Sequence, residues 1–184
     1  MNRPTSSIRM RGAVAALVLA AAGGPLAAHA EPTAVTATGF VAKFHHELKS
    51  PPAKLFEAIG HVERWWSAEH SYSGDAANFS MGLDAGNCFC ERWAGGSVQH
   101  GRVELVMRDR MVRIDGAFGP LQSLAVNAVL TFSIKAVDGH AVLDTTYCVG
   151  GPPDAGLDKL ATPVDGVIGE QVARLVKLVD AGSP

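Results

Sequence analysis

The strongest constraint on the fold is a long apolar stripe near the C-terminus. Between residues 157 and 179 the side chains that recur at helical spacing are Leu157, Leu160, Val164, Val167, Ile168, Gln171, Leu175 and Leu178. A helix with such a stripe has to bury it against another layer of structure. The segments before it alternate apolar and polar residues, as antiparallel strands with one buried face do. The sequence therefore predicts an α+β fold, in which a curved antiparallel sheet wraps around one long helix and leaves space between them.

About seven strands and two short helices are expected before the long helix. The predicted strands span residues 38–48, 79–83, 89–93, 97–107, 111–117, 124–134 and 141–149. Ser50-Pro51-Pro52 introduces a short helix over residues 53–59, and residues 61–66 form a second helical turn. Asp84 to Asn87 has the composition of a turn, so residues 79–93 form a hairpin.

Two glycines interrupt the side-chain cover of the long helix. Gly166 and Gly169 lie on adjacent faces of it and lower its intrinsic stability. Close packing on a strand is one reason for them, and room for a ligand beneath the helix is the other.

The first thirty residues have the three parts of a secretory signal peptide. Arg3, Arg9 and Arg11 give a basic head, residues 12–22 form a short apolar core, and Ala28 and Ala30 supply a small-residue cleavage pattern. Cleavage is expected after Ala30, which leaves residues 31–184 as a single periplasmic or secreted domain. The apolar core is shorter than the roughly 20 residues of a spanning helix, so we expect no stable membrane insertion after cleavage; an uncleaved anchor is the alternative.

The charge balance argues against nucleic acid as a partner. The full chain carries 16 basic and 18 acidic residues, and residues 1–30 hold three of the basic ones and no acidic one. The remaining 13 basic and 18 acidic residues give a net charge of −5. No basic stripe is present to displace the counterions of a nucleic acid.

Residues 65–93 hold the most informative side chains. Trp65, Trp66, His70 and Tyr72 lead into the predicted hairpin and suggest the rim of a cavity. Strand alternation places Glu91 inward with Phe89 and Trp93. Burial there would raise the pKa of Glu91 and make it a candidate general acid or base.

Glu91 also has two simpler interpretations. It can form a buried pair with a neighbour such as Arg102, or it can face outward if Cys88 and Cys90 are the inward residues.

The cysteines and histidines do not predict a metal site. His70, His100, Cys88 and Cys90 are suitable residue types, but their spacing matches no compact zinc motif. His100 is expected on the outer face of its strand unless Gly101 marks a bulge. We therefore predict no metal and no cofactor.

The three cysteines leave at least one thiol unpaired within the chain. Cys88 and Cys90 are expected on the same face of one strand, which is a poor geometry for bridging each other. Cys148 can reach one of them only if their strands are neighbours.

Several segments together resemble a known superfamily. They are Pro51-Pro52 through Phe56, Trp65-Trp66 with residues 70–74 (HSYSG), residues 86–91 (GNCFCE), residues 119–122 (GPLQ), and Val164-Asp165 with Gln171 and Arg174-Leu175. With the order of the elements, they resemble the SRPBCC superfamily, which includes START, birch-pollen-allergen-like and polyketide-cyclase-like domains. Within it the chain is similar to the bacterial branch near heat-shock-ATPase activator homologues.

The resemblance implies a helix-grip fold and a hydrophobic cavity between the sheet and the C-terminal helix. Such cavities hold lipids, polyketides or other apolar molecules, and the resemblance implies no single reaction. The expected ligand-binding residues are Trp66, Tyr72, Phe79, Phe89, Glu91, Trp93, Phe132, Tyr147, Val164, Ile168 and Gln171.

Two functions follow from this interpretation. The first is binding or carriage of a hydrophobic small molecule. The second is a cyclase- or hydrolase-like enzyme that uses Glu91 as acid or base in the same cavity. No G-x-S-x-G, P-loop, dinucleotide-binding or H-E-x-x-H motif is present in the sequence to favour other chemistry.

The signal peptide can be tested by mass. We expect the protein recovered from the periplasm or medium of its host to begin at Glu31. Intact-mass measurement of that species checks the prediction, and an exported protein that retains residues 1–30 would contradict it.

Overall fold

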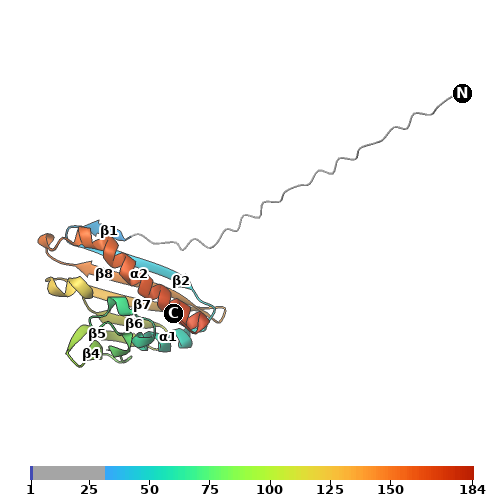
Figure 1. Ribbon diagram of the computed structural model, residues 1–184, viewed down its shortest axis with the longest axis horizontal. Helices are drawn as coiled ribbons and strands as arrows, with labels where there is room; N and C mark the ends of the chain where they lie inside the picture. Colours follow the sequence, from blue (N-terminus) through green and yellow to red (C-terminus); the bar gives the residue numbers. More distant parts are fainter. Residues whose placement is uncertain (2–31) are drawn as a thin grey trace.

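The computed structural model describes Met1 and residues 32–184, in the arrangement shown in Figure 1. The predicted signal peptide, apart from Met1, lies outside the described residues. Within them, no helix has both the length and the apolar character needed to cross a membrane.

Eight antiparallel strands form one sheet in the order β1-β2-β8-β7-β6-β5-β4-β3. The strands are β1 (Thr33–Thr36), β2 (Gly39–Glu47), β3 (Phe79–Ser80), β4 (Cys88–Trp93), β5 (Gly96–Met107), β6 (Met111–Asp115), β7 (Asn127–Val137) and β8 (His140–Gly150). The seven expected strands are all present, and β1 is an additional one. All four residues of β1 are exposed, so this strand has no buried face that an apolar alternation could reveal.

Two α-helices and five short 3₁₀ segments complete the described part of the chain. The α-helices are α1 (Pro52–Gly60) and α2 (Leu157–Ala181). The 3₁₀ segments are η1 (Val62–Arg64), η2 (Ala68–His70), η3 (Ala76–Asn78), η4 (Gly119–Ser123) and η5 (Pro153–Ala155).

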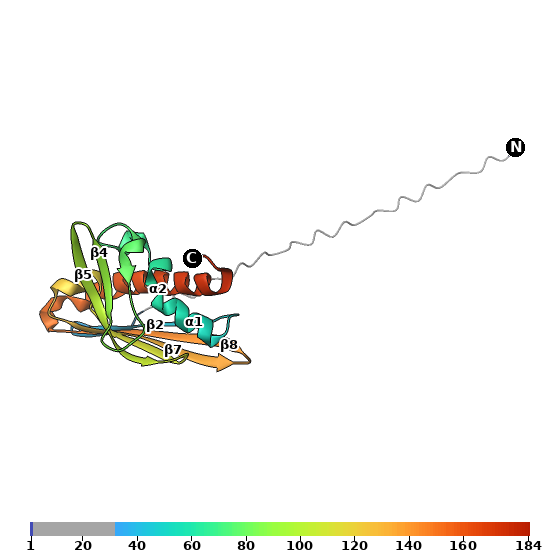
Figure 2. The same ribbon diagram turned by 90° about the horizontal axis from the view of Figure 1, so that it is seen from below.

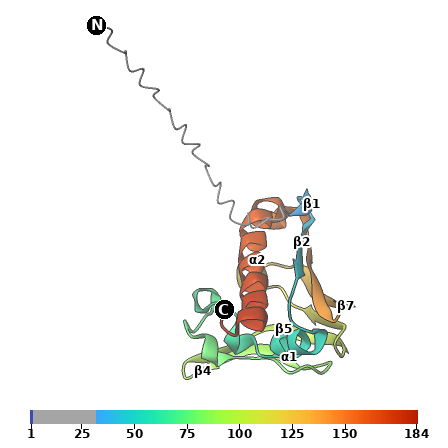
Figure 3. The ribbon, with the colours of Figure 1, turned by 90° about the vertical axis from the view of Figure 1, so that its right-hand side faces the viewer.

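The sheet curls around α2. Figure 2 shows β4 and β5 turned away from the plane of β2, β7 and β8, with α2 in the angle between the two parts. Figure 3 shows α2 alongside β2, with α1 close to the C-terminal end of α2. This is the helix-grip arrangement that the sequence predicts.

The predicted apolar stripe of α2 forms one side of the core. Leu157, Val164, Ile168, Gln171, Leu175 and Leu178 are all buried. Leu160 and Val167 are only partly buried, and both reappear below in the wall of a cleft.

The two helix glycines have different surroundings. A Cβ atom added at Gly169 would lie 2.9 Å from Cε1 of Phe44 on β2, which is closer than two carbon atoms can pack. A Cβ atom at Gly166 would have no neighbour within 4 Å. Close packing on a strand therefore explains Gly169, and neither glycine lines the cleft described below.

This difference can be measured with two alanine variants. We expect Gly166→Ala to raise the free energy of unfolding by about 0.5–1 kcal/mol, because alanine is the better helix former. In Gly169→Ala the same gain is offset by about 1–3 kcal/mol, because the new methyl group displaces the Phe44 ring. Urea unfolding of both variants checks this, and equal stabilisation by the two would contradict it.

Candidate functional site

The loop that follows α1 is fastened to α2 by two hydrogen bonds. The N–H of Ser67 donates to Oε1 of Gln171 over 2.7 Å, and Nε of Arg174 donates to the carbonyl oxygen of Trp65 over 2.8 Å. Trp65 and Trp66 are both buried and anchor the loop in the core. The loop and the helix therefore form a fixed pair of walls.

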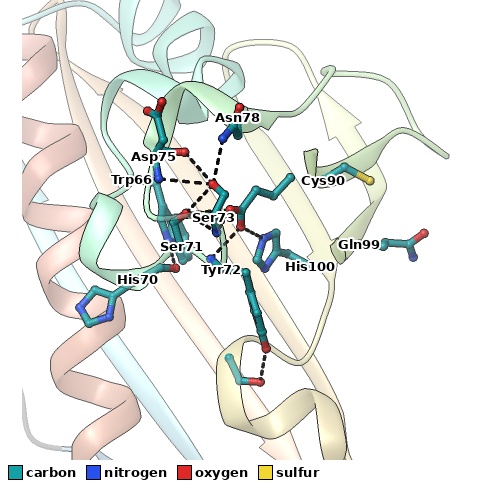
Figure 4. Close-up of polar contacts among 12 residues, drawn as sticks. Trp66, His70, Ser71, Tyr72, Ser73, Asp75, Asn78, Cys90, Gln99 and His100 are labelled. Atoms are coloured by element: carbon teal, nitrogen blue, oxygen red, sulfur yellow. Dashed lines mark hydrogen bonds and ion pairs between the residues drawn. The ribbon is translucent and has the colours of Figure 1, made fainter. Parts of the chain in front are cut away.

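Glu91 lies at the centre of a buried polar cluster. Its side chain has no solvent exposure. Oε1 accepts hydrogen bonds from the Ser71 hydroxyl at 2.7 Å and from the Ser73 N–H at 2.6 Å. Oε2 accepts from the Tyr72 N–H at 3.1 Å and contacts Nε2 of His100 at 3.0 Å. Figure 4 shows Ser71, Ser73 and His100, three of the residues that contact this carboxylate, lying close together.

The expectation of a raised pKa at Glu91 is wrong. Burial alone would raise the pKa of Glu91, but hydrogen bonds with Ser73 and Ser71, together with the backbone N–H groups of Ser73 and Tyr72, outweigh it and lower the pKa to about 2. These donors lie up to 20 residues before Glu91, so strand alternation could not reveal them. Glu91 is therefore ionised near neutral pH and is not available as a general acid.

His100 is the buried partner of Glu91, in the place where the sequence suggested Arg102. Phe89 pairs with Gly101 and Cys90 pairs with Gln99, so His100 is the extra residue of a bulge in β5. This bulge turns His100 to the inside, where its side chain is 3% exposed, and corrects the expected outward position. Arg102 instead donates to the carbonyl oxygen of Gly86.

The protonation state of His100 follows from its surroundings. Burial lowers the pKa of His100, although the Glu91 carboxylate acts in the opposite direction. Because ionised Glu91 only accepts hydrogen bonds, we assign the proton to Nε2, which leaves a lone pair on Nδ1. Within residues 32–184, Nδ1 of His100 has no hydrogen-bond partner.

Aromatic rings surround this polar pair. The His100 ring lies 5.1 Å from the ring of Phe89 and 5.2 Å from that of Phe79, centroid to centroid. Trp66 packs against Phe118 at 5.8 Å, and Phe118 stacks on Tyr147 at 5.2 Å.

Tyr147 holds the segment that carries Phe118. Its hydroxyl donates to the carbonyl oxygen of Gly116 and accepts the N–H of Phe118, at 3.0 and 3.1 Å. Burial raises the pKa of Tyr147, so it remains neutral and able to donate. The aromatic side of the site is therefore fixed by hydrogen bonds as well as by packing.

A cleft of about 370 Å³ opens between α2 and these aromatic rings. The first half of α2 supplies an apolar wall, and the loop after α1 and segment 118–120 supply the other. The lining residues are Trp66, Glu69, His70, Ser71, Tyr72, His100, Phe118, Gly119, Pro120, Leu160, Pro163, Val164, Val167 and Ile168.

Tyr72 connects two sides of the cleft mouth. Its side chain is 55% exposed, and its hydroxyl lies within hydrogen-bond distance of the Gly119 carbonyl oxygen (3.3 Å) and of Oε1 of Gln122 (3.2 Å). On the opposite side, Nε2 of His70 lies 3.1 Å from Oε2 of Glu170 on α2 (the His70 side chain is drawn in Figure 4). The cleft is thus apolar inside and polar at its rim.

The structure brings four of the expected ligand-binding residues into the cleft. They are Trp66, Tyr72, Val164 and Ile168. The other expected residues lie behind or outside its walls: Glu91, Phe79 and Phe89 around His100; Tyr147 beneath Phe118; Gln171 on Ser67; Phe132 in the core against Trp65; and Trp93 beside Gly95 and Gly96.

The sequence reasoning did not include His100, Phe118, Leu160 or Val167 among the binding residues. Leu160 and Val167 belong to the predicted apolar stripe of the helix. Their position at the edge of that stripe could have indicated that they line a cleft. For His100, the neighbouring Gly101 was the available indication of a bulge that turns the side chain inward. Phe118 had no such signal, because it lies in an irregular segment.

Cys88 and Cys90 form a disulfide, contrary to the geometric expectation. Their Cα atoms lie 5.3 Å apart, within the usual range for disulfides. A regular strand would hold residues i and i+2 about 6.6–6.8 Å apart, so the irregular pairing opposite the bulge brings them together. Cys148 on β8 is exposed and unpaired.

No group of three or more His, Cys, Asp or Glu side chains among the described residues is arranged to hold a metal ion.

Comparison with known proteins identifies the fold. No family model and no curated protein sequence matches the chain. Among solved structures, protein MLL2253 from Mesorhizobium loti has a TM-score of 0.58 and 15% identity, with 78% of this chain and 99% of that one covered. The Aha1 dimer from Colwellia psychrerythraea has a TM-score of 0.56 and 16% identity, with 78% and 98% covered.

A third neighbour is CalU16 from Micromonospora echinospora. Its TM-score is 0.54 and its identity 10%, with 79% of this chain and 77% of that one covered. At such identities the likeness concerns the fold alone. The chain therefore shares the helix-grip fold of these bacterial proteins, and its membership of the SRPBCC superfamily stays a prediction.

The lowered pKa of Glu91 gives a test by acid unfolding. The pKa is about 2 in the folded protein against a reference value of 4.5, so the carboxylate stabilises the fold above pH 4.5 by about 3 kcal/mol. That stabilisation is lost as the pH falls toward 2. We expect Glu91→Gln to lose about this amount at pH 7 and to show a shallower decline between pH 4.5 and 2.

Denaturant unfolding at several pH values measures both effects. Glu104→Gln, at an exposed carboxylate on β5, serves as the matched control and should keep the stability of the wild type at pH 7. Parallel pH profiles for wild type and Glu91→Gln would contradict the assignment.

Proposed function

We propose that this protein binds a hydrophobic small molecule, lipid-like or polyketide-like, in the cleft between the sheet and α2. The observation that carries the proposal is the apolar wall of the cleft, which is lined by Leu160, Val164, Val167 and Ile168 of α2 and, from other segments, by Trp66 and Phe118. The cleft volume of about 370 Å³ falls at the lower end of the range for small-molecule sites, roughly 300–1,000 Å³.

The polar groups at the cleft suit such a ligand. His70, His100 and Tyr72 lie along an otherwise apolar surface, and a few convergent polar groups are what orients a ligand in sites of this kind. The loop after α1 is fixed to α2 through Gln171 and Arg174. Because the walls are already in place, binding costs little further ordering of the protein.

We further propose that the protein acts in the periplasm or outside the cell. The three-part leader of residues 1–30 supports this proposal. The Cys88–Cys90 disulfide also supports it, because disulfides persist mainly in oxidising compartments.

The binding proposal can be tested with an apolar fluorescent probe. We expect N-phenyl-1-naphthylamine to bind the wild type with enhanced fluorescence, and Val167→Trp to weaken that binding about tenfold or more, because the larger ring occupies the cleft. Ala173→Trp, at an exposed position of the same helix, is the matched control and should bind as the wild type does.

Two results would count against the binding proposal. One is equal probe binding by Val167→Trp and the wild type. The other is the absence of any apolar molecule in native mass spectra of protein purified gently from its host, together with an unchanged melting temperature across a panel of lipids.

A second candidate function is a cyclase- or hydrolase-like enzyme working in the same cleft. The observation that favours it is the buried Glu91–His100 pair, in which a carboxylate orients an imidazole whose Nδ1 has no partner among residues 32–184. In this version His100 is the acid–base group and Glu91 fixes its orientation, in place of the role first expected for Glu91 itself.

The enzymatic candidate is tested by His100→Gln, because a glutamine amide can still donate to Glu91 while the imidazole is lost. With p-nitrophenyl esters as substrates, an enzyme should lose at least about a hundredfold in kcat and keep its affinity for the naphthylamine probe. If the wild-type protein hydrolyses these esters no faster than buffer alone does, the proposal of a hydrolase is contradicted.

A further inference from the structure

We propose that the Cys88–Cys90 disulfide is a redox-active site that exchanges with a dithiol, and that its reduction repositions His100 at the cleft. The proposal concerns β4 and β5 and does not depend on which molecule the cleft binds.

The disulfide closes a very short loop. Only Phe89 separates the two cysteines, so the bond removes little conformational freedom from the unfolded chain. Cross-links that stabilise a whole domain usually close longer loops. The effect of this bond is therefore local, on the strand that carries it.

The two sulfur positions differ in accessibility. Cys88 is partly exposed, whereas Cys90 is only 5% exposed. An incoming thiolate therefore reaches Sγ of Cys88. Arg102 is the cross-strand partner of Cys88, and its guanidinium bonds the nearby Gly86 carbonyl oxygen, which places a positive charge near this end of β4. A positive charge near a cysteine favours its thiolate form.

The exchange has two balanced steps. A thiolate of the dithiol attacks Sγ of Cys88, the S–S bond breaks, and Cys90 leaves as a thiolate that takes up a proton. The second thiol of the reagent then loses its proton and attacks the reagent's first sulfur, which is bonded to Sγ of Cys88 in the mixed disulfide. This step releases Cys88 as a thiolate. Two electrons pass to the cysteine pair, and the dithiol becomes a disulfide.

The same bond spans the irregular pairing that places His100. On β4, Cys88 and Cys90 are two residues apart; on β5, their partners Arg102 and Gln99 are three residues apart, and His100 is the extra residue. The bond holds the Cα atoms of Cys88 and Cys90 at 5.3 Å, shorter than the roughly 6.6–6.8 Å of a regular strand. Reduction lets β4 extend at this point.

Extension of β4 changes the surroundings of both members of the buried pair. Glu91 follows Cys90 directly in the chain, and Oε2 of Glu91 contacts Nε2 of His100 at 3.0 Å. A shift of β4 along β5 therefore moves His100, which lies in the cleft wall. The redox state of the cysteine pair would then control the shape of the cleft.

The test uses the Cys148→Ser variant, so that only the Cys88–Cys90 pair can react with thiol reagents. The folded protein is incubated with dithiothreitol, alkylated and weighed, and the imidazole nitrogen signals are recorded by NMR before and after reduction. The His100 signals are assigned by their loss in His100→Gln. We expect both cysteines to be alkylated while the protein remains folded, and the His100 signals to shift.

A variant of the Cys148→Ser protein that also carries both Cys88→Ser and Cys90→Ser should show the spectrum of the reduced protein without any reductant. Three results would overturn the proposal: a pair that resists dithiothreitol until the protein unfolds, His100 signals unchanged on reduction, or isolation of the exported protein with both thiols already free. The spectrum of the reduced Cys148→Ser protein decides the matter even where the serine variant does not fold.

Discussion

The arrangement of the cleft depends on the buried carboxylate of Glu91. A charge without solvent contact is tolerated only when its hydrogen-bonding capacity is met, and here four donors from two separate segments meet it. Through these bonds one side chain on β4 fixes both residues 71–73 and His100 on β5. The aromatic and polar wall of the cleft is assembled around this anion.

The opposite wall depends on the curvature of the sheet. β4 and β5 turn away from the plane of β2, β7 and β8, and α2 lies in the angle between these two parts of the sheet (Figure 2). The helix α1 packs against α2, and the loop after α1 is bound to the second half of α2 through Gln171 and Arg174. Over the first half of α2, Leu160 and Val167 stay partly exposed. The cleft lies along this first half of α2.

The inward position of Glu91 was predictable, whereas its chemistry was not. Alternation with Phe89 is a local property of β4 and gave the correct direction. The pKa depends on which donors surround the carboxylate, and these come from residues 71–73 and 100. Burial raises the pKa of a carboxyl group, whereas hydrogen bonds to its ionised form lower it. The pKa of Glu91 is therefore lowered, although burial alone predicted a raised value.

The amino-acid sequence determined the seven main strands, the two short helices before the hairpin and the apolar stripe of α2, because periodicities of 2 and 3.6 residues are local properties of the chain. The tertiary structure decided the rest. The bulge that turns His100 inward, the approach of Cys88 to Cys90 and the pairing of exposed β1 all depend on a neighbouring strand. A residue's pairing partner across a sheet, unlike its own alternation, is set by contacts between segments far apart in the sequence.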